Sequence, residues 1–186
     1  TVITYAGEVG SDGFNYAMIY WMYQALKYYG NFIIFTDSSN FYKVAQEMEH
    51  WGTKIVRDII WKKTKNDALV TLDSLVHEHE TIIWGSKINF NDNKTRPFSN
   101  IADYKGDVWE FDVKRKTENP NEKPELLLEE LILLTTDPGQ LILNPYSGSG
   151  EVLSALKRLG RRFIGIEKDK YWHKVCLDRL ASTPVM

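Results

Sequence analysis

The chain has 186 residues, of which 43% are apolar and 13% aromatic, and its formal net charge is −2. This length is enough to bury one sizeable core but is crowded for two, so we expect a single domain over residues 1–186. The charge balance excludes a protein that binds nucleic acid through overall basicity, so any DNA-binding surface must be a local patch.

Short β-rich runs alternate with helical stretches, a pattern typical of an α/β fold with a mostly parallel sheet. Most of the apolar runs are continuous, as in strands covered on both faces. In chain order, the expected strands cover residues 1–4, 32–36, 54–61, 81–84, 141–143 and 163–166. The expected helices cover residues 14–29, 39–51, 125–135, 151–159 and 170–180, most of them ending near a glycine that predicts a C-terminal cap.

The first expected helix is unusually rich in aromatic residues. Either the sheet and a neighbouring helix cover it on most sides, or some of its aromatics lie at the interface of a homodimer or heterodimer. The residues concerned are Tyr16, Tyr20, Trp21, Tyr23, Tyr28 and Tyr29.

Residues 89–119 interrupt the α/β pattern with isolated aromatics among polar residues, prolines and glycines, and predict a short irregular insert. The insert also holds the densest positive charge in the chain. It is either a solvated loop or a groove that follows the phosphate backbone of double-stranded DNA. The candidate DNA-binding residues are Lys94, Arg96, Lys114, Arg115 and Lys116.

Other features limit the chemistry and the location. Cys176 is the single cysteine, which excludes an intrachain disulfide and favours a reducing compartment. His77 and His79 have no third ligand at metal spacing, so we expect no metal. No apolar run approaches the roughly 20 residues that span a bilayer. We therefore expect a cytoplasmic or nucleoid-associated protein with no membrane partner.

The most informative motif is a strand that runs into a glycine turn at the start of a helix. It reads Leu141-Ile-Leu-Asn-Pro-Tyr-Ser-Gly-Ser-Gly150. Such a turn points backbone N–H groups at open space, where a carboxylate or phosphate can bind. The next strand ends in Glu167, about 20 residues later, the spacing at which a carboxylate can accept both ribose hydroxyls of an adenosine. Together the two features predict an adenosine-containing ligand.

These residues carry a family resemblance. The segments Asn-Pro-Asn-Glu-Lys-Pro (119–124), Asn-Pro-Tyr-Ser-Gly-Ser-Gly (144–150) and Ile-Gly-Ile-Glu (164–167) resemble consecutive motifs of the β-class DNA amino-methyltransferases, which methylate N6 of adenine or N4 of cytosine. The resemblance implies a three-layer, Rossmann-like α/β fold of the S-adenosylmethionine-dependent type and S-adenosylmethionine as cofactor. A nucleotide-dependent oxidoreductase shares the turn but has no reason to contain segment 119–124.

The resemblance also implies roles for matching positions. The turn 146–150 would lie beside the methionine part of the cofactor, Glu167 on its ribose, and Asp37 on the cofactor side of the sheet. The implied cofactor-binding residues are Asp37, Lys123, Asn144, Pro145, Tyr146, Ser147, Gly148, Ser149, Gly150 and Glu167.

The resemblance fails at the first strand. The family has Asp-Pro-Pro-Tyr or a close variant there, whose acceptors localise the lone pair of the target amine while the aromatic stacks on the extruded base. The catalytic residues are expected near positions 4–8, which read Thr4, Tyr5, Ala6, Gly7 and Glu8.

Two further positions depart from the family pattern. Asn144 stands where Asp is usual, and Glu151 where a small hydroxyl residue is usual, and both weaken the expected cofactor site. Either the protein is a degenerate methyltransferase kept as a DNA- or protein-binding subunit, or residues between Thr4 and Tyr5 are absent from this sequence. We favour degeneracy.

Overall fold

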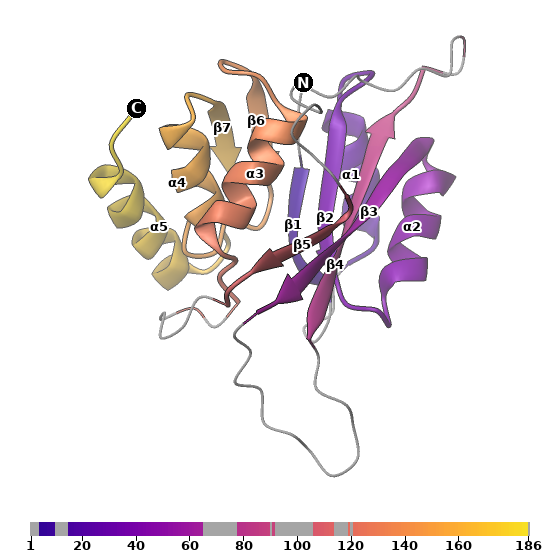
Figure 1. Ribbon diagram of the computed structural model, residues 1–186. Helices are drawn as coiled ribbons and strands as arrows, with labels where there is room; N and C mark the ends of the chain where they lie inside the picture. The colour runs from indigo at the N-terminus through magenta and orange to yellow at the C-terminus, as the bar shows by residue number, and fades with distance from the viewer. Residues whose placement is uncertain are drawn as a thin grey trace.

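The computed structural model of the chain describes residues 4–9, 15–64, 78–89, 91, 106–113, 119 and 121–185. Strands and helices alternate over most of this length (Figure 1). The strands are β1 (Thr4–Val9), β2 (Asn31–Thr36), β3 (Thr53–Lys63), β4 (His79–Lys87), β5 (Val108–Phe111), β6 (Leu141–Asn144) and β7 (Arg162–Gly165). The helices are α1 (Ala17–Ala25), α2 (Phe41–His50), α3 (Glu125–Thr135), α4 (Glu151–Arg158) and α5 (Lys170–Ser182).

The described strands form one seven-stranded sheet in the order β5-β3-β4-β2-β1-β6-β7. Strand β4 runs antiparallel to both of its neighbours, and the other four pairs are parallel. The expectation of a mostly parallel sheet is therefore confirmed. Because β4 reverses direction between β2 and β3, those two strands point the same way as β1, β6 and β7.

Helices cover both faces of the sheet, which gives the expected three layers (Figure 1). Successive residues of a strand face opposite sides. In β2, Ile33 and Phe35 pack in the core under α3 and α4, while Phe32 and Ile34 pack in the core under α1 and α2. All four side chains are at most 2% exposed, so β2 is buried on both faces as its continuous apolar run predicts.

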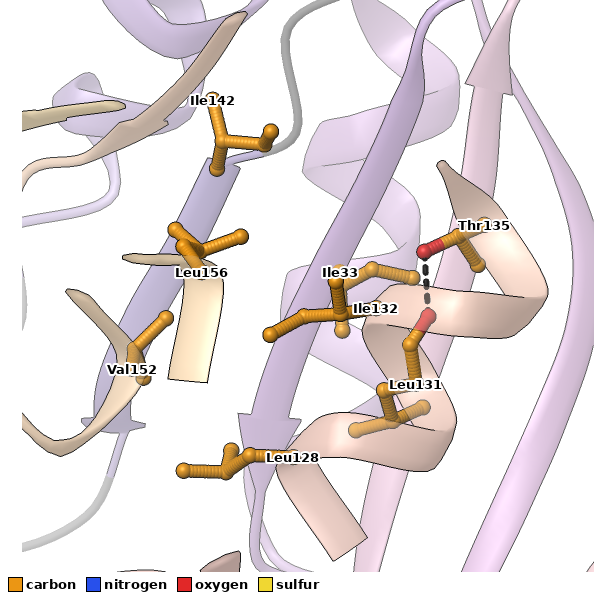
Figure 2. Close-up of a pocket in the computed structure, with 8 residues that line it drawn as sticks. All are labelled: Ile33, Leu128, Leu131, Ile132, Thr135, Ile142, Val152 and Leu156. Carbon is orange, nitrogen blue, oxygen red and sulfur yellow. Dashed lines mark hydrogen bonds between the residues drawn. The ribbon is translucent and has the colours of Figure 1, made fainter. Parts of the chain in front are cut away.

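The core under α3 and α4 contains a small apolar cavity of about 30 Å³. Figure 2 shows side chains from β2, β6, α3 and α4 around it. The only polar side chain in its lining is Thr135, whose hydroxyl donates to the carbonyl oxygen of Leu131. The lining residues are Ile33, Leu128, Leu131, Ile132, Thr135, Ile142, Val152 and Leu156.

Two expected elements are wrong in their extent. The predicted helix over 14–29 is the shorter α1, because the backbone leaves the helical conformation at Leu26, whose ψ is 132°. Beyond the helix, Tyr29 adopts a φ of 61°, and its N–H donates to the carbonyl of Lys87 in β4 at 2.7 Å. The prediction of irregular structure throughout 89–119 is wrong for β5, which pairs with β3 from Val108 to Phe111.

The first strand also differs from its prediction. Residues 1–3 lie outside the described residues, and the strand that the structure describes continues to Val9. Thr4, Tyr5 and Ala6 pair in succession with β2, and an irregularity follows between Ala6 and Val9. Residues 5–8 therefore belong to the strand rather than to a loop after it.

Candidate functional site

The candidate site lies at the edge of the sheet where the parallel strands end. Asp37 follows β2, segment 145–150 follows β6, and Glu167 comes two residues after β7. In parallel α/β sheets, ligands bind outside these carboxyl ends. The topology thus brings the predicted cofactor residues of the C-terminal half to one edge.

The glycine turn is held in an open shape by its backbone. Gly148 and Gly150 have φ values of 50° and 83°, which side-chain-bearing residues rarely adopt. The Gly150 N–H donates to the Ser147 carbonyl at 2.8 Å, and the Ser147 N–H donates to the Ile166 carbonyl at 2.9 Å. The turn is therefore fastened both to itself and to the chain beyond β7.

Glu167 reaches across this turn. Its Oε2 accepts a hydrogen bond from the Gly148 N–H at 2.8 Å, and its Oε1 accepts one from the Asp169 N–H at 2.8 Å. Each carboxylate oxygen has a further lone pair for a ligand hydroxyl. The predicted pairing of the glycine turn with the acid of the next strand is thus present in the fold, with the carboxylate fixed by two backbone groups.

Asn144 lies at the base of the turn and is fully buried. Its Oδ1 accepts from the Tyr146 N–H at 3.2 Å, whereas its Nδ2 has no hydrogen-bond partner among the described residues. Tyr146 is 36% exposed, and burial raises the pKa of its hydroxyl. Asn144 therefore shapes the turn, and Tyr146 is the large side chain of the turn that reaches solvent.

A charged cluster that sequence reasoning missed surrounds Ser149. The Ser149 hydroxyl lies 2.7 Å from Glu122 Oε1 and 3.1 Å from Glu151 Oε2, and Glu122 also accepts a hydrogen bond from the Arg179 guanidinium. Asn119 Nδ2 donates to the same hydroxyl at 3.3 Å. Segment 119–124, α4 and α5 thus meet at the start of α4, although Arg179 carries no motif that could reveal it.

Helix α5 packs directly against the turn. A Cβ on Gly150 would lie 2.6 Å from the Cys176 Sγ and 3.1 Å from its Cα. Burial raises the pKa of the Cys176 thiol, and the charge of Glu151 adds to the rise. Cys176 is therefore the buried apolar residue that its helical position suggests, and it explains why residue 150 has no side chain.

Lys123 is engaged away from the turn. Lys123 is 3% exposed, and its ammonium lies 2.7 Å from Glu80 Oε2, while the Lys63 ammonium lies 2.9 Å from Glu80 Oε1. Burial would raise the pKa of the Glu80 carboxyl, but the charges and hydrogen bonds of Lys123 and Lys63 outweigh it and lower the pKa. In this structure Lys123 ties segment 119–124 to β4, and its contact with a cofactor stays a prediction.

Asp37 is bound by its own loop. Its Oδ1 accepts from the Ser39 hydroxyl at 2.6 Å and from the N–H groups of Ser39 and Asn40 at 2.8 and 2.9 Å. Burial would raise the pKa of the carboxyl, but these hydrogen bonds outweigh it and lower the pKa. Asp37 thus stabilises the entry to α2, and a cofactor role for it stays a prediction.

Comparison with known proteins decides the family. A family model described as DNA methylase matches residues 10–177. The Type II methyltransferase M2.DpnII of Streptococcus pneumoniae is 37% identical over 172 residues, which cover 86% of this chain. The chain belongs to the DNA N6/N4 amino-methyltransferase family. It spans 63% of the length of that relative.

Solved structures share the fold of this chain. The crystal structure of the M1.HpyAVI–SAM complex has a TM-score of 0.81 at 24% identity and covers 96% of this chain and 88% of its own. The PvuII cytosine-N4-specific DNA methyltransferase has a TM-score of 0.74 at 15% identity and covers 100% of this chain and 82% of its own. At these identities the likeness concerns the fold alone.

The expected catalytic positions begin beside β6, the strand that leads into the turn. Thr4 pairs with Leu143, so Tyr5 follows at the height of Asn144.

The candidate DNA-binding residues Lys94, Arg96 and 114–116 lie outside the described residues. Among the described residues, no group of three or more His, Cys, Asp or Glu side chains could hold a metal ion, and no helix is long and apolar enough to cross a membrane.

Proposed function

We propose that the turn 145–150 and Glu167 bind S-adenosylmethionine, and that the protein is built as a DNA amino-methyltransferase acting on N6 of adenine or N4 of cytosine. The observation that carries this proposal is the Glu167 carboxylate held across the glycine turn by the Gly148 N–H. A ligand with ribose hydroxyls at one end and a charged amino-acid group at the other fits such a site. Family membership supports the choice of cofactor.

The proposed reaction is a direct displacement. The lone pair of the base amine attacks the methyl carbon as the carbon–sulfur bond breaks, and that bond pair returns to sulfur in S-adenosylhomocysteine. The proton that the amine loses passes to a base or to water. The protein binds and aligns both reactants, with the base extruded from the duplex, because proximity and orientation supply much of the rate.

The proposed substrate is double-stranded DNA, for which the basic residues of the insert are the candidate contacts. Phosphate contacts of Lys and Arg would make binding depend on salt. We propose that the protein acts on this substrate in the cytoplasm or on the nucleoid. The single domain over 1–186 is also part of this proposal, and its support is that all described strands belong to one sheet.

A second candidate is a subunit that keeps the fold, binds DNA or protein, and does not catalyse transfer. The sequence of β1 favours it. Tyr5-Ala-Gly-Glu8 replaces the acceptor, both prolines and the aromatic of the family tetrapeptide, and its first two residues are paired inside the sheet. This candidate predicts surviving DNA or protein association without methyl transfer.

Pairing with a second subunit is part of either candidate. Three aromatic side chains around α1 and α2 are more than half exposed, namely Trp21 at 62%, Tyr28 at 58% and Tyr42 at 80%. Large exposed aromatics are enriched at protein interfaces. A solution mass equal to one chain would contradict this part of the proposal.

A methyl-transfer assay separates the two candidates. The full chain is incubated with duplex DNA and methyl-labelled S-adenosylmethionine, and the DNA is digested to identify the labelled base. Label in N6-methyladenine or N4-methylcytosine that Glu167→Ala abolishes supports the enzyme. Absence of label on DNA of every sequence context tested, with DNA association retained, contradicts the enzyme and supports the non-catalytic subunit.

A further inference from the structure

The cluster at the start of α4 contains more hydrogen-bond acceptors than Ser149 can serve. Its hydroxyl lies within 3.1 Å of one oxygen of Glu122 and one oxygen of Glu151, but a hydroxyl has a single proton to donate. Glu122 also receives the Arg179 guanidinium. Glu151 also accepts from its own backbone N–H, so the two carboxylates together share one hydroxyl and one guanidinium.

The cluster also contains more negative than positive charge. Glu122 and Glu151 face one cation, Arg179, within the part of the chain that the structure describes. Glu122 is 5% exposed, whereas Glu151 is partly exposed. Burial raises the pKa of the Glu151 carboxyl, and the charge of Glu122 adds to the rise. A proton or a bound cation would relieve both effects.

Asn144 cannot provide the matching negative charge in the same turn. Its Oδ1 is already used by the Tyr146 N–H, and its Nδ2 is a donor, which repels a cation. The turn thus lacks a charge at position 144 and carries one at position 151.

We propose that Glu151 recognises the α-ammonium group of the methionine part of S-adenosylmethionine. This inference rests on the proposed function of the turn. An ammonium group offers three N–H donors and one positive charge, whereas Glu122 and Glu151 share one hydroxyl and one cation among the described residues. Glu151 would thereby compensate, from the start of α4, for the negative charge that Asn144 does not supply.

Cofactor binding at Glu151 should be coupled to the ionisation of its carboxyl group. A bound ammonium favours the ionised carboxylate, so the pKa of Glu151 falls when the cofactor binds. At a pH where Glu151 is protonated in the free protein, binding releases that proton. Cofactor affinity should therefore decrease as pH falls through the free-protein pKa of Glu151, because protonation must then be reversed before binding.

The test compares two ligands by calorimetric titration of the full chain. S-adenosylmethionine carries the ammonium group, whereas 5′-methylthioadenosine has the adenosine and the sulfur but no amino-acid group. Glu151→Gln is expected to weaken S-adenosylmethionine binding by about ten- to a hundredfold and to leave 5′-methylthioadenosine binding unchanged. Glu49→Gln, the same chemical change on the exposed part of α2, should alter neither affinity.

Proton release is measured by repeating the titration in buffers of different ionisation enthalpy. Over the pH range in which Glu151 titrates in the free protein, the unsubstituted protein should release protons on binding S-adenosylmethionine, and Glu151→Gln should not. Equal affinity and equal proton release in both proteins would overturn the inference, as would tighter binding by Glu151→Thr, because Glu151 would then obstruct the ligand. Binding of 5′-methylthioadenosine without S-adenosylmethionine would also overturn it while leaving the adenosine site intact. Failure of both ligands to bind would contradict the proposed function itself.

Discussion

Glu167 and Lys123 are both predicted cofactor-binding residues, but they take different places in the fold. Glu167 is fixed by the N–H groups of Gly148 and Asp169, at the edge where a ligand can approach. Lys123 lies under the surface, paired with Glu80 and 5.5 and 5.8 Å from the ring centres of Phe35 and Trp61. Removing one partner of such a buried pair leaves an uncompensated charge, so Lys123 is expected to matter for folding whatever its part in binding.

Gly150 provides a prediction at the scale of one residue. Gly150→Ala should reduce the free energy of unfolding by about 2–4 kcal/mol, because the new Cβ meets Cys176 and the backbone has a positive φ. Denaturant unfolding measures the change. Gly160→Ala is the matched control, since Gly160 has a φ of 68° with nothing within 4 Å of an added Cβ, and should cost only about 1 kcal/mol. Equal losses in the two variants would mean that α5 does not press on the turn.

The packing of α3 and α4 against the sheet leaves the apolar cavity of Figure 2 between them. Empty apolar volume in a core costs stability, because its lining loses dispersion contacts. Such a cavity stays dry, since its lining offers a water few polar partners. The two helices are thus held by a core that is not fully packed, directly behind the start of α4.

A cavity-filling substitution tests this packing. Val152→Ile adds one methylene toward the cavity and should increase the free energy of unfolding by about 0.5–1 kcal/mol. The same change at Val44, a fully buried residue of α2 that does not line this cavity, should decrease it by about 1 kcal/mol. Thermal or denaturant unfolding provides both values. A loss of stability in Val152→Ile as large as that in Val44→Ile would contradict the cavity.

Over the whole molecule, local patterns were predictable and distant contacts were not. The continuous apolar runs predict β2, β6 and β7. The pairing of the glycine turn with Glu167 is also predictable, because Gly148 and Glu167 are only 19 positions apart in the sequence. The pair of Glu122 and Arg179 joins residues 57 positions apart, and no sequence pattern links them. Strand β5 was missed because its four residues lie in a polar segment and depend on pairing with β3. Tertiary contacts of this kind override local propensity.

The central claim, a cofactor site made by the glycine turn and Glu167, is tested most directly by calorimetric titration of the full chain with S-adenosylmethionine. We expect a Kd in the micromolar range, which corresponds to a free energy of binding of about −8 kcal/mol. Binding should be lost in Glu167→Ala. Glu49→Ala on α2 serves as the control and should bind like the unsubstituted protein. No detectable binding by the unsubstituted protein, or undiminished binding by Glu167→Ala, would contradict the account.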